Sequence, residues 1–341
     1  MRIGLAFVFC CFCLAGCTSD NEERCAFVPE VSSVKINLAF ESLEDSLPAF
    51  SNKTQLVHFL GQYQVLRDQF FNRQSYPGDS AFINELYQRF TNPHLDTLLK
   101  ETHRVFGSDL ELKGEFVKAF ANLTYYYPEF RSPKIQTVIT GLESDLMVSD
   151  SLVIVGLDYF LGKGSKYKPN MYEYLLKRYN KGFIVPSVVL LMGIDSRFNK
   201  VNPDDRTVLA DMIAYGKAYY FTKQMLPCTP DSVLIGYTRK EIEESRKYEN
   251  LIWSRFIEDQ VLYATNHLVK QRYIGERPKT TEVGEQCPGR IGMWVGWQIV
   301  KKYMKTHPEV KLQQLMNMQN AAQLFKDSGY KPQVVKLRGG G

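Results

Sequence analysis

The sequence lacks the residue spacings on which many hydrolases depend. Its five histidines are His58, His94, His103, His267 and His307, and no two of them lie four residues apart. A helix that binds zinc through two imidazoles needs that spacing, because residues at i and i+4 share one helical face. The G-x-S-x-G turn of the serine hydrolases is also absent. We therefore assign no catalytic residue, no metal ligand and no cofactor from these motifs.

Long blocks of one charge are missing too. Lys and Arg number 42 and Asp and Glu 37, which gives a net charge of +5, and the basic residues are spread along the chain. Proteins that bind nucleic acids usually concentrate positive charge in one stripe or patch. We therefore expect no nucleic-acid partner. The chain is 44% hydrophobic and 13% aromatic, which is typical of a globular protein.

Cysteine is too sparse beyond the amino terminus for a disulfide framework. Apart from four cysteines among the first 17 residues, the chain has only Cys25, Cys228 and Cys287, an odd number with no C-x-x-C spacing. One disulfide can still form among them in an oxidising compartment. Nothing in the sequence pairs Cys287 with a general base. Most lone cysteines are packed in the protein interior and are not nucleophiles.

The first 17 residues, MRIGLAFVFCCFCLAGC, have the pattern of an export signal. Arg2 precedes a short apolar run, and small residues precede Cys17. The run is too short to span a membrane. Leu14-Ala15-Gly16-Cys17 resembles the bacterial lipobox, which implies cleavage before Cys17 and a covalent lipid on its thiol. We expect a signal peptide over 1–16, a lipidated tether over 17–30, and attachment to a bacterial envelope membrane, favouring the outer membrane.

The rest of the chain predicts one α+β domain over 31–333, mostly helical with a small sheet, followed by a tail over 334–341. Alternating apolar residues indicate a strand at 32–40, and β-rich segments at 133–142 and 150–162 indicate further strands. Helical spacing, interrupted by Pro and Gly, covers the remaining segments. The predicted helices span 52–71, 81–90, 93–106, 111–128, 170–179, 185–194, 202–226, 238–263 and 288–304.

Two of these helices have clear start signals. Asn202 followed by Pro203 and two aspartates predicts a helix capped by Asn202. Thr238 with Glu241 matches a capping box. In the helix that begins there, we expect one apolar face to be buried, made of Ile252, Trp253, Phe256, Ile257 and Val261.

The last long helix contains glycines at 289, 292 and 296. Each interior glycine costs a helix about 0.8–1 kcal/mol relative to alanine. Gly292 and Gly296 match a small-x-x-x-small pattern, but the apolar run is too short to cross a bilayer. Gly289 precedes the first turn. We interpret Gly292 and Gly296 as a packing face that lets a neighbouring backbone approach; the alternative is a cleft with a thin wall.

Four segments resemble the gliding-motility-associated lipoprotein family GldB. They are LADMIAYGKAYYFTKQMLPCTPDSVLIGYTRKEIE, ENLIWSRFIEDQVLYAT, PGRIGMWVGWQIVKKYM and LFKDSGYKP, in that order behind the lipobox. The resemblance implies a role in gliding motility or the associated secretion and envelope machinery, with envelope proteins as partners. Proteins of this kind are similar in turn to gluzincin peptidases, which implies a zincin-like architecture with a metal-binding helix.

The chain departs from the peptidase pattern where the metal should bind. If the helix over 204–226 is the equivalent of the metal helix, Met212, Ile213 and Gly216 stand where the first histidine, the catalytic glutamate and the second histidine would be. None of these side chains can ligate zinc or activate water. We therefore expect a non-catalytic, metal-free protein that acts by contact.

The expected contact surface is the former cleft. One wall is formed by Arg290, Gly292, Trp294, Gly296 and Trp297, and the other by Asp211, Tyr215 and Lys217. Two alternatives remain open. One is a hydrolase that collects ligands from distant residues such as His103, His267 and Glu258. The other is a glycan- or peptide-binding lipoprotein that uses Tyr125, Tyr126 and Tyr127 as a stacking platform.

Overall fold

A computed structural model describes residue 25 and residues 27–334. The signal peptide over 1–16, Cys17, the tether up to residue 24 and most of the expected tail lie outside the described residues. Within them the chain is α+β, as predicted, with a four-stranded sheet in the order β1-β2-β4-β3. The strands are β1 (Phe40–Ser42), β2 (Lys134–Val138), β3 (Leu146–Val148) and β4 (Leu152–Gly156). β1, β2 and β4 are parallel, and β3 pairs antiparallel to β4.

The sheet is covered on both faces, which explains the unbroken apolar run of its central strand. Val153 and Val155 of β4 pack into the larger core, whereas Ile154 between them packs into the smaller one. All three are fully buried, as expected for a parallel strand between two helical layers.

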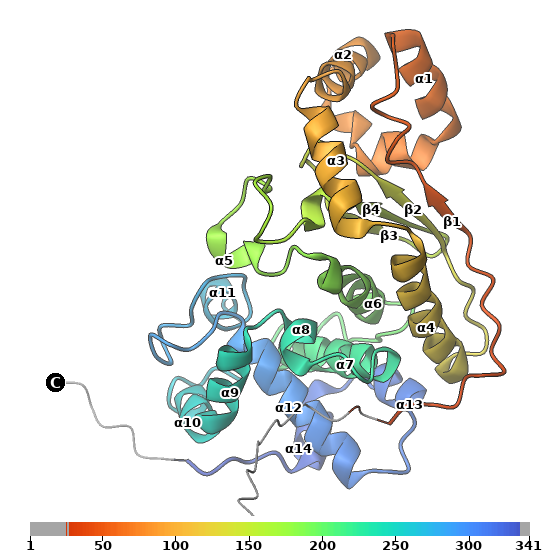
Figure 1. Cartoon of the computed structure of the whole chain (residues 1–341). Helices are drawn as coiled ribbons and strands as arrows, with labels where there is room; N and C mark the ends of the chain where they lie inside the picture. The colour runs from red at the N-terminus through yellow and green to blue at the C-terminus, as the bar shows by residue number, and fades with distance from the viewer. Residues whose placement is uncertain (1–24, 26, 335–341) are drawn as a thin grey trace, which may run out of the picture.

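The helices divide between these two cores. Figure 1 shows α1 and α2 at one end of the molecule, the sheet beside α3 and α4, and the remaining helices gathered on the other side. The smaller core contains side chains of α1 (Lys53–Gln62), α2 (Asp79–Phe90) and α3 (Leu95–Phe106), whereas α4 (Leu110–Tyr126) packs into the larger core. The other helices, on the side of the larger core, are α5 (Glu173–Leu176), α6 (Ile184–Ile194), α7 (Val208–Met225), α8 (Asp231–Ile235), α9 (Arg239–Lys247), α10 (Glu249–Glu258), α11 (His267–Tyr273), α12 (Ile291–Thr306), α13 (Leu312–Asn317) and α14 (Ala321–Ser328).

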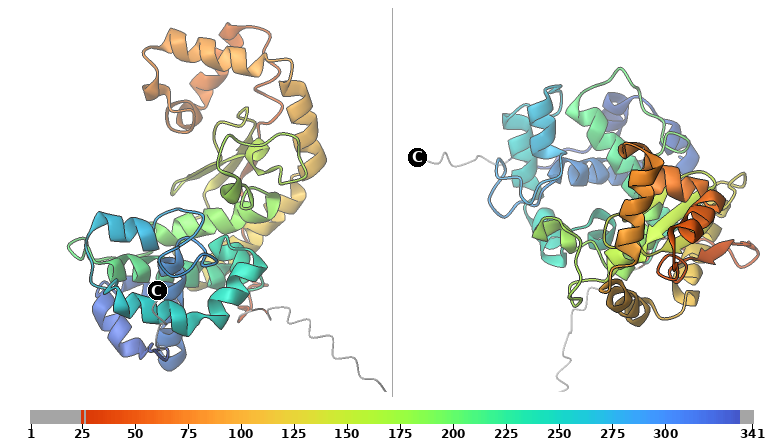
Figure 2. Two further views of the ribbon diagram at one scale, coloured as in Figure 1. Left: turned by 90° about the vertical axis from the view of Figure 1, so that its left-hand side faces the viewer. Right: turned by 90° about the horizontal axis from the view of Figure 1, so that it is seen from above.

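The segment before β1 is connected to the larger helical body at its other end. It runs along the side of the molecule from the sheet to the helices below (Figure 1, and Figure 2 from two other directions). A disulfide there joins Cys25 to Cys228, which are 203 residues apart in sequence, and Cys287 is a free thiol. The one disulfide that the sequence allowed is therefore formed. The spacing of the cysteines in the sequence could not identify which two of them pair.

Two predicted element starts are wrong for local reasons. The expected strand over 32–40 is reduced to β1, because a turn lies at Val31–Val34 and pairing begins only at Phe40. Asn202 does not cap α7. Its Oδ1 accepts from the amide of Asp204 in a separate turn, and α7 begins six residues later, where Thr207 Oγ1 accepts from the amide of Ala210 at 3.1 Å.

The capping box at Thr238 and Glu241 is confirmed, with both reciprocal hydrogen bonds present. The helix that follows is not continuous: it breaks at Tyr248 into α9 and α10. The break and the end of α10 change part of the expected buried face. Ile252, Trp253, Phe256 and Val261 are buried, but Ile257 is 44% exposed.

The glycine-bearing helix α12 crosses α7 at very close range. A Cβ on Gly296 would lie 1.9 Å from the carbonyl oxygen of Met212, and one on Gly216 would lie 2.4 Å from the carbonyl oxygen of Gly296. The two helices therefore meet glycine to glycine, and the packing interpretation of Gly296 is confirmed. Gly292 faces a different neighbour: its Cβ would lie 2.9 Å from the carbonyl oxygen of Tyr273, at the end of α11.

Replacing Gly296 with Ala should destabilise the fold, because the new methyl group has nowhere to go unless the two backbones separate. We expect a loss of at least about 2–3 kcal/mol in the free energy of unfolding, measured by urea denaturation. Gly114→Ala in α4 is the matched control, because its Cβ would meet nothing within 4 Å. That variant should be stabilised by up to about 1 kcal/mol. Equal effects at both positions would contradict the backbone contact.

Candidate functional site

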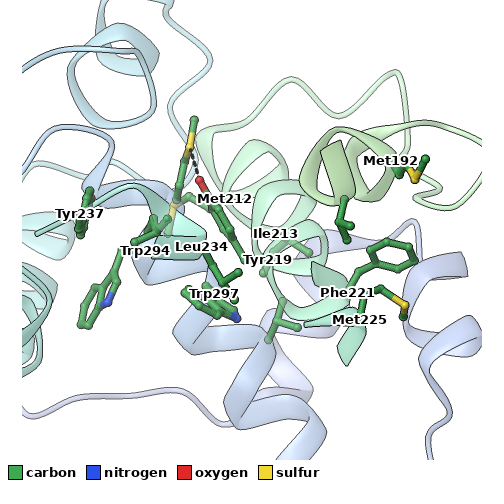
Figure 3. Close-up of a cluster of buried hydrophobic side chains, with 14 of the residues drawn as sticks. Met192, Met212, Ile213, Tyr219, Phe221, Met225, Leu234, Tyr237, Trp294 and Trp297 are labelled. Carbon is green, nitrogen blue, oxygen red and sulfur yellow. Dashed lines mark hydrogen bonds between the residues drawn. The ribbon is translucent and has the colours of Figure 1, made fainter. Parts of the chain in front are cut away.

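The expected cleft between α7 and α12 is filled by packed side chains. Trp294 and Trp297 are 1% and 0% exposed, so they belong to the core and do not form the wall of an open groove. Figure 3 shows both rings among buried side chains from α6, α7 and α8, with Tyr219 close by. The ring centroids of Tyr219 and Trp297 are 5.3 Å apart. Gly292 and Gly296 are buried as well.

The positions assigned to the lost metal motif lie in the same core. Met212 and Ile213 are 0% and 2% exposed, and Gly216 contacts the backbone of α12. Apolar side chains fill the space on this part of α7 (Figure 3). In these positions the residues stabilise the helix crossing, and they offer neither an imidazole nor a carboxylate to a zinc ion.

Arg290 is a structural cross-link. It lies just before α12 with a positive φ of 60°. Its side chain is 11% exposed, and Nη2 donates to the carbonyl oxygen of Ile235 at 2.8 Å. Nε lies 3.5 Å from Glu276 Oε2, and the guanidinium lies 5.8 Å from the ring centroid of Tyr237. With these partners Arg290 fixes the start of α12 to the end of α8.

Asp211 and Tyr215, two further residues of the expected cleft, remain partly exposed. Asp211 forms an ion pair with Lys270 of α11 at 2.8 Å. Burial, with a contribution from the Asp211 charge, raises the pKa of Tyr215 above its ordinary value. Tyr215 therefore stays a neutral phenol near pH 7.

A polar pocket of about 270 Å³ lies beside the first half of α7. We call it the α7 pocket. Its charged lining is made of Lys200, Asp205, Arg206, Asp211, Lys217 and Lys270. Four cations against two carboxylates give this lining an excess of positive charge. Arg206 is exposed at its edge, which makes the pocket suited to an acidic group on another molecule.

Lys217, also expected on the cleft wall, is a buried cation held by backbone carbonyls. It is 1% exposed, and its Nζ donates to the carbonyl oxygens of Lys200, Met316 and Met318 at 2.6, 3.3 and 2.7 Å. Burial lowers the pKa of this amine to about 8. The side chain therefore ties α7 to the segment after α6 and to the end of α13.

The described residues do not supply the donors of a zinc site. No group of three or more His, Cys, Asp or Glu among them could hold a metal ion. The ligands considered for a hydrolase have other partners: His103 Nε2 lies 2.9 Å from Asp45 Oδ1, and Glu258 pairs with Arg255 at 2.9 Å. His267 is the first residue of α11, on a different element from either. We derive no metal-dependent step from these residues.

The three consecutive tyrosines do not form a flat platform. Tyr125 is 46% exposed, but Tyr126 donates its hydroxyl hydrogen to Gln224 of α7 at 3.0 Å. Tyr127 packs edge-on against Phe198, with the centroids 5.1 Å apart. The end of α4 therefore packs against α7.

Cys287 lines a second, more apolar pocket of about 350 Å³ between α9, α10 and the loop before α12. Burial raises the pKa of its thiol to about 12. The thiol is therefore protonated at neutral pH and is not an activated nucleophile.

An ionic cluster that sequence reasoning missed surrounds Asp231, at the start of α8. This carboxylate is 6% exposed and lies 2.5 Å from Lys301 Nζ, 3.1 Å from Arg246 Nη2 and 3.3 Å from Lys223 Nζ. Burial alone would raise the pKa of Asp231, but the ammonium groups of Lys301 and Lys223 bring it below its ordinary value. Lys301 also lies 3.9 Å from the ring centroid of Trp297. The partners are up to 78 residues apart, so no local pattern reveals the cluster.

These features define a helical α+β protein with a fully packed centre, a polar pocket beside its central helix and no zincin ligand set among the residues described. The family described as gliding motility protein GldB matches residues 24–332, and the chain belongs to this family of gliding-motility lipoproteins. No curated protein and no solved structure matches the chain. Among the described residues, no helix combines the length and apolar character needed to cross a membrane.

Replacing Lys217 with Met should destabilise the protein, because three backbone carbonyls lose the ammonium donor, which only that of Met316 replaces in part through the amide of Lys200. We expect a loss of about 2–4 kcal/mol in the free energy of unfolding. Lys240→Met is the control, because that side chain is 77% exposed on α9. The free energies of unfolding of the two variants are compared by calorimetry or by urea denaturation. A Lys217 variant as stable as the control would refute the stabilising role of the hydrogen bonds from Lys217 to the three carbonyls.

Replacing Asp231 with Asn should leave three cations without their shared counter-ion and cost about 3–5 kcal/mol near pH 7. The pH dependence should also change. Because the folded-state pKa is below the ordinary value of 3.8, the stabilisation by Asp231 is present above pH 3.8 and is lost as the pH falls through the lowered pKa. Unfolding free energies measured between pH 2 and 7 should therefore show a shallower acid limb in Asp231→Asn than in Glu243→Gln, whose wild-type carboxylate is 60% exposed. Parallel acid limbs would contradict this assignment.

Proposed function

We propose that this protein is a lipid-anchored, non-catalytic component of gliding motility and the associated envelope or secretion machinery, and that it acts by binding other envelope proteins. The observation that carries the proposal is the α7–α12 crossing. At the positions where a zincin-like metal helix would present its ligands, Met212, Ile213 and Gly216 are committed to core packing. The membership in the GldB family supports the link to motility.

We infer that the α7–α12 crossing differs from a metal-binding helix pair in its packing as well as in its missing ligands. Restoring an imidazole at position 216 would place its Cβ 2.4 Å from the carbonyl oxygen of Gly296. The helix pair is thus built around the small residue, and a metal helix in this register would need a different spacing between α7 and α12. This packing supports the proposal that the domain has a structural role and does not hydrolyse peptides.

The surface that we propose for a partner is the α7 pocket. Asp211 is already paired with Lys270, and Asp205 accepts hydrogen bonds from the amide and hydroxyl of Thr207. The exposed guanidinium of Arg206 is the cation best placed to meet an incoming carboxylate. We infer that an acidic segment of an envelope protein binds there.

Reversing the charge of Arg206 tests this proposal. In cells whose chromosomal copy carries Arg206→Glu, we expect crosslinked capture of envelope partners to fall at least about tenfold and gliding to be lost, because two like charges then meet. Lys240→Glu, on the exposed face of α9, should retain both. Membrane levels of each variant are measured by immunoblot to exclude loss of the protein itself.

Two results would overturn the proposal. One is stoichiometric zinc in the purified protein. The other is cleavage of a peptide library that His267→Ala abolishes. Unchanged capture of partners by Arg206→Glu would instead remove only the α7 pocket from the contact surface.

A further inference from the structure

β3 forms one edge of the sheet, and its hydrogen bonds to β4 show which of its backbone groups are used. The amide of Gly156 donates to the carbonyl oxygen of Asp145 at 2.7 Å, and the amide of Ser149 donates to the carbonyl oxygen of Leu152 at 2.9 Å. Hydrogen-bonded and non-hydrogen-bonded pairs alternate along an antiparallel ladder. Every second residue of this segment, counted from Asp145, therefore directs its amide and carbonyl groups towards β4.

The two residues that alternate with these, Leu146 and Val148, direct their backbone groups away from the sheet. The amide of Leu146 donates to the side chain of Asp145 at 2.7 Å. Within the described part of the chain, the amide of Val148 and the carbonyl oxygens of both residues form no hydrogen bond. β3 is partly exposed along its whole length. These three groups are therefore free to bind a further strand.

Apolar side chains accompany this open edge. α6 packs against β3 (Figure 1), and the side chains of Leu146 and Val148 contact the larger core on that face of the sheet. On α6 itself, Leu191 and Ile194 are 43% and 40% exposed, and residues three apart share one helical face. A strand added to β3 would direct alternate side chains towards the face of the sheet that α6 covers. Apolar residues at those positions would fit this surface.

The charged residues of the β3 segment are all acidic. Glu143 and Asp145 precede the strand and Asp150 follows it, and the chain has no lysine or arginine between residues 135 and 162. None of these three carboxylates forms an ion pair with any residue that the structure describes. The only side-chain partner of Asp145 is the neutral hydroxyl of Tyr179, at 2.9 Å.

Four cations contact or act on this region, and each is already paired with a carboxylate elsewhere. They reach it through the loop before β3, the residue after Arg178, the turn before β4 and the charge of Asp150. The ion pairs are Arg89–Glu85, Lys134–Glu41, Arg178–Glu276 and Arg197–Asp195, at 3.4, 2.7, 2.8 and 2.9 Å. The acids of the edge are therefore left for the cations of another molecule.

The charge distribution distinguishes between possible partners. If β3 paired with β3 of a second copy, the acids of both copies would lie along one ladder, and like charges facing each other destabilise a strand pair. An extended segment with lysine or arginine between apolar residues has the opposite property. Its cations would meet the free carboxylates, and its apolar side chains would cover the face beside α6.

We propose that β3 binds an extended segment of another envelope protein, which joins the sheet as a further strand and has apolar residues alternating with lysine or arginine. Strand addition of this kind takes its affinity from main-chain hydrogen bonds and its specificity from alternate side chains. The surface is separate from the α7 pocket, which is lined by residues 200–217, Lys270 and residues 318–321 and is suited to an acidic group. It therefore extends the proposed function with a second contact of opposite charge.

The first test is hydrogen exchange in the purified full-length protein, with a short synthetic peptide in which valine alternates with lysine. When the peptide is saturating, the amide hydrogen of Val148 should exchange at least about tenfold more slowly, because it gains an acceptor. Met147 is the internal control. Its amide already faces β4 and should exchange at an unchanged rate. Both amides are followed by NMR.

A substitution that removes only the free amide gives a second test. Val148→Pro should remain folded, because proline is tolerated on an edge strand where the N–H group faces solvent. Its affinity for the peptide, measured by fluorescence anisotropy, should fall at least about tenfold. Val148→Thr keeps the amide and should bind as the unaltered protein does. If Val148→Pro does not fold, the same peptide with all its amides methylated gives this test on the unaltered protein and should bind at least about tenfold more weakly.

The contribution of charge is measured separately. The double variant Glu143→Gln/Asp150→Asn should bind the peptide about threefold to tenfold more weakly, with a smaller dependence on salt. A peptide in which valine alternates with glutamate should not bind the unaltered protein. Arg206→Glu, which alters the α7 pocket, should leave the affinity for the lysine peptide unchanged.

The results separate this inference from the α7 pocket. An unchanged exchange rate of Val148 at saturating peptide, or equal binding of the methylated peptide, would overturn strand addition and leave the α7 pocket untouched. Equal binding of the glutamate peptide would overturn the preference for a basic segment. Self-association that is seen by analytical ultracentrifugation and lost in Val148→Pro would overturn the other envelope protein as the partner, in favour of a second copy.

Discussion

The close approach of α7 and α12 at Gly216 and Gly296 determines how the rest of the larger helical body is arranged. With a carbonyl oxygen 1.9 Å from where the Cβ of Gly296 would be, the two backbones are in contact and no side chain lies between them. Helices at this distance cannot slide or rotate without collision. Every element attached to either helix takes its position from this contact. Gly292 brings the end of α11 against α12, and Arg290 holds the end of α8.

Two buried charges, Lys217 beside Gly216 at the crossing and Asp231 at the start of α8, add specificity to a contact that is otherwise only steric. Lys217 draws three backbone carbonyls from two separate segments onto α7, and Asp231 draws cations from α7, α9 and α12 onto the start of α8. Burying a charge is costly, and such groups are weak contributors to net stability. Each has a geometry that only one arrangement of its neighbours satisfies. We infer that the charges select the arrangement that apolar packing at the crossing makes stable.

Features encoded within a few residues were readable from the sequence. The apolar runs of β2 and β4 predicted the sheet, and the Thr238–Glu241 capping box forms as expected, because all the atoms involved lie within one turn. The start of α7 was missed because Asp205 binds Thr207, and Thr207 then caps the helix in competition with Asn202. The short helices α8, α11 and α13 hold too few residues for a period of 3.6 to stand out.

The candidate site was harder to predict because some of its expected residues are buried and others are exposed. The sequence alone does not specify which. Trp294 and Trp297 were expected at a cleft and lie in the core, whereas Arg206 was not singled out and lies at the edge of the α7 pocket. The pairing of Cys25 with Cys228 was equally hidden, since it depends on the side segment returning to the helical body. It has a mechanical consequence for a protein anchored through Cys17. Force on the lipid would pass through the disulfide into α7 and hence into the glycine crossing, and would bypass β1 and the sheet. The glycine crossing therefore lies on the path by which a membrane-bound motility component would transmit its load into the larger helical body.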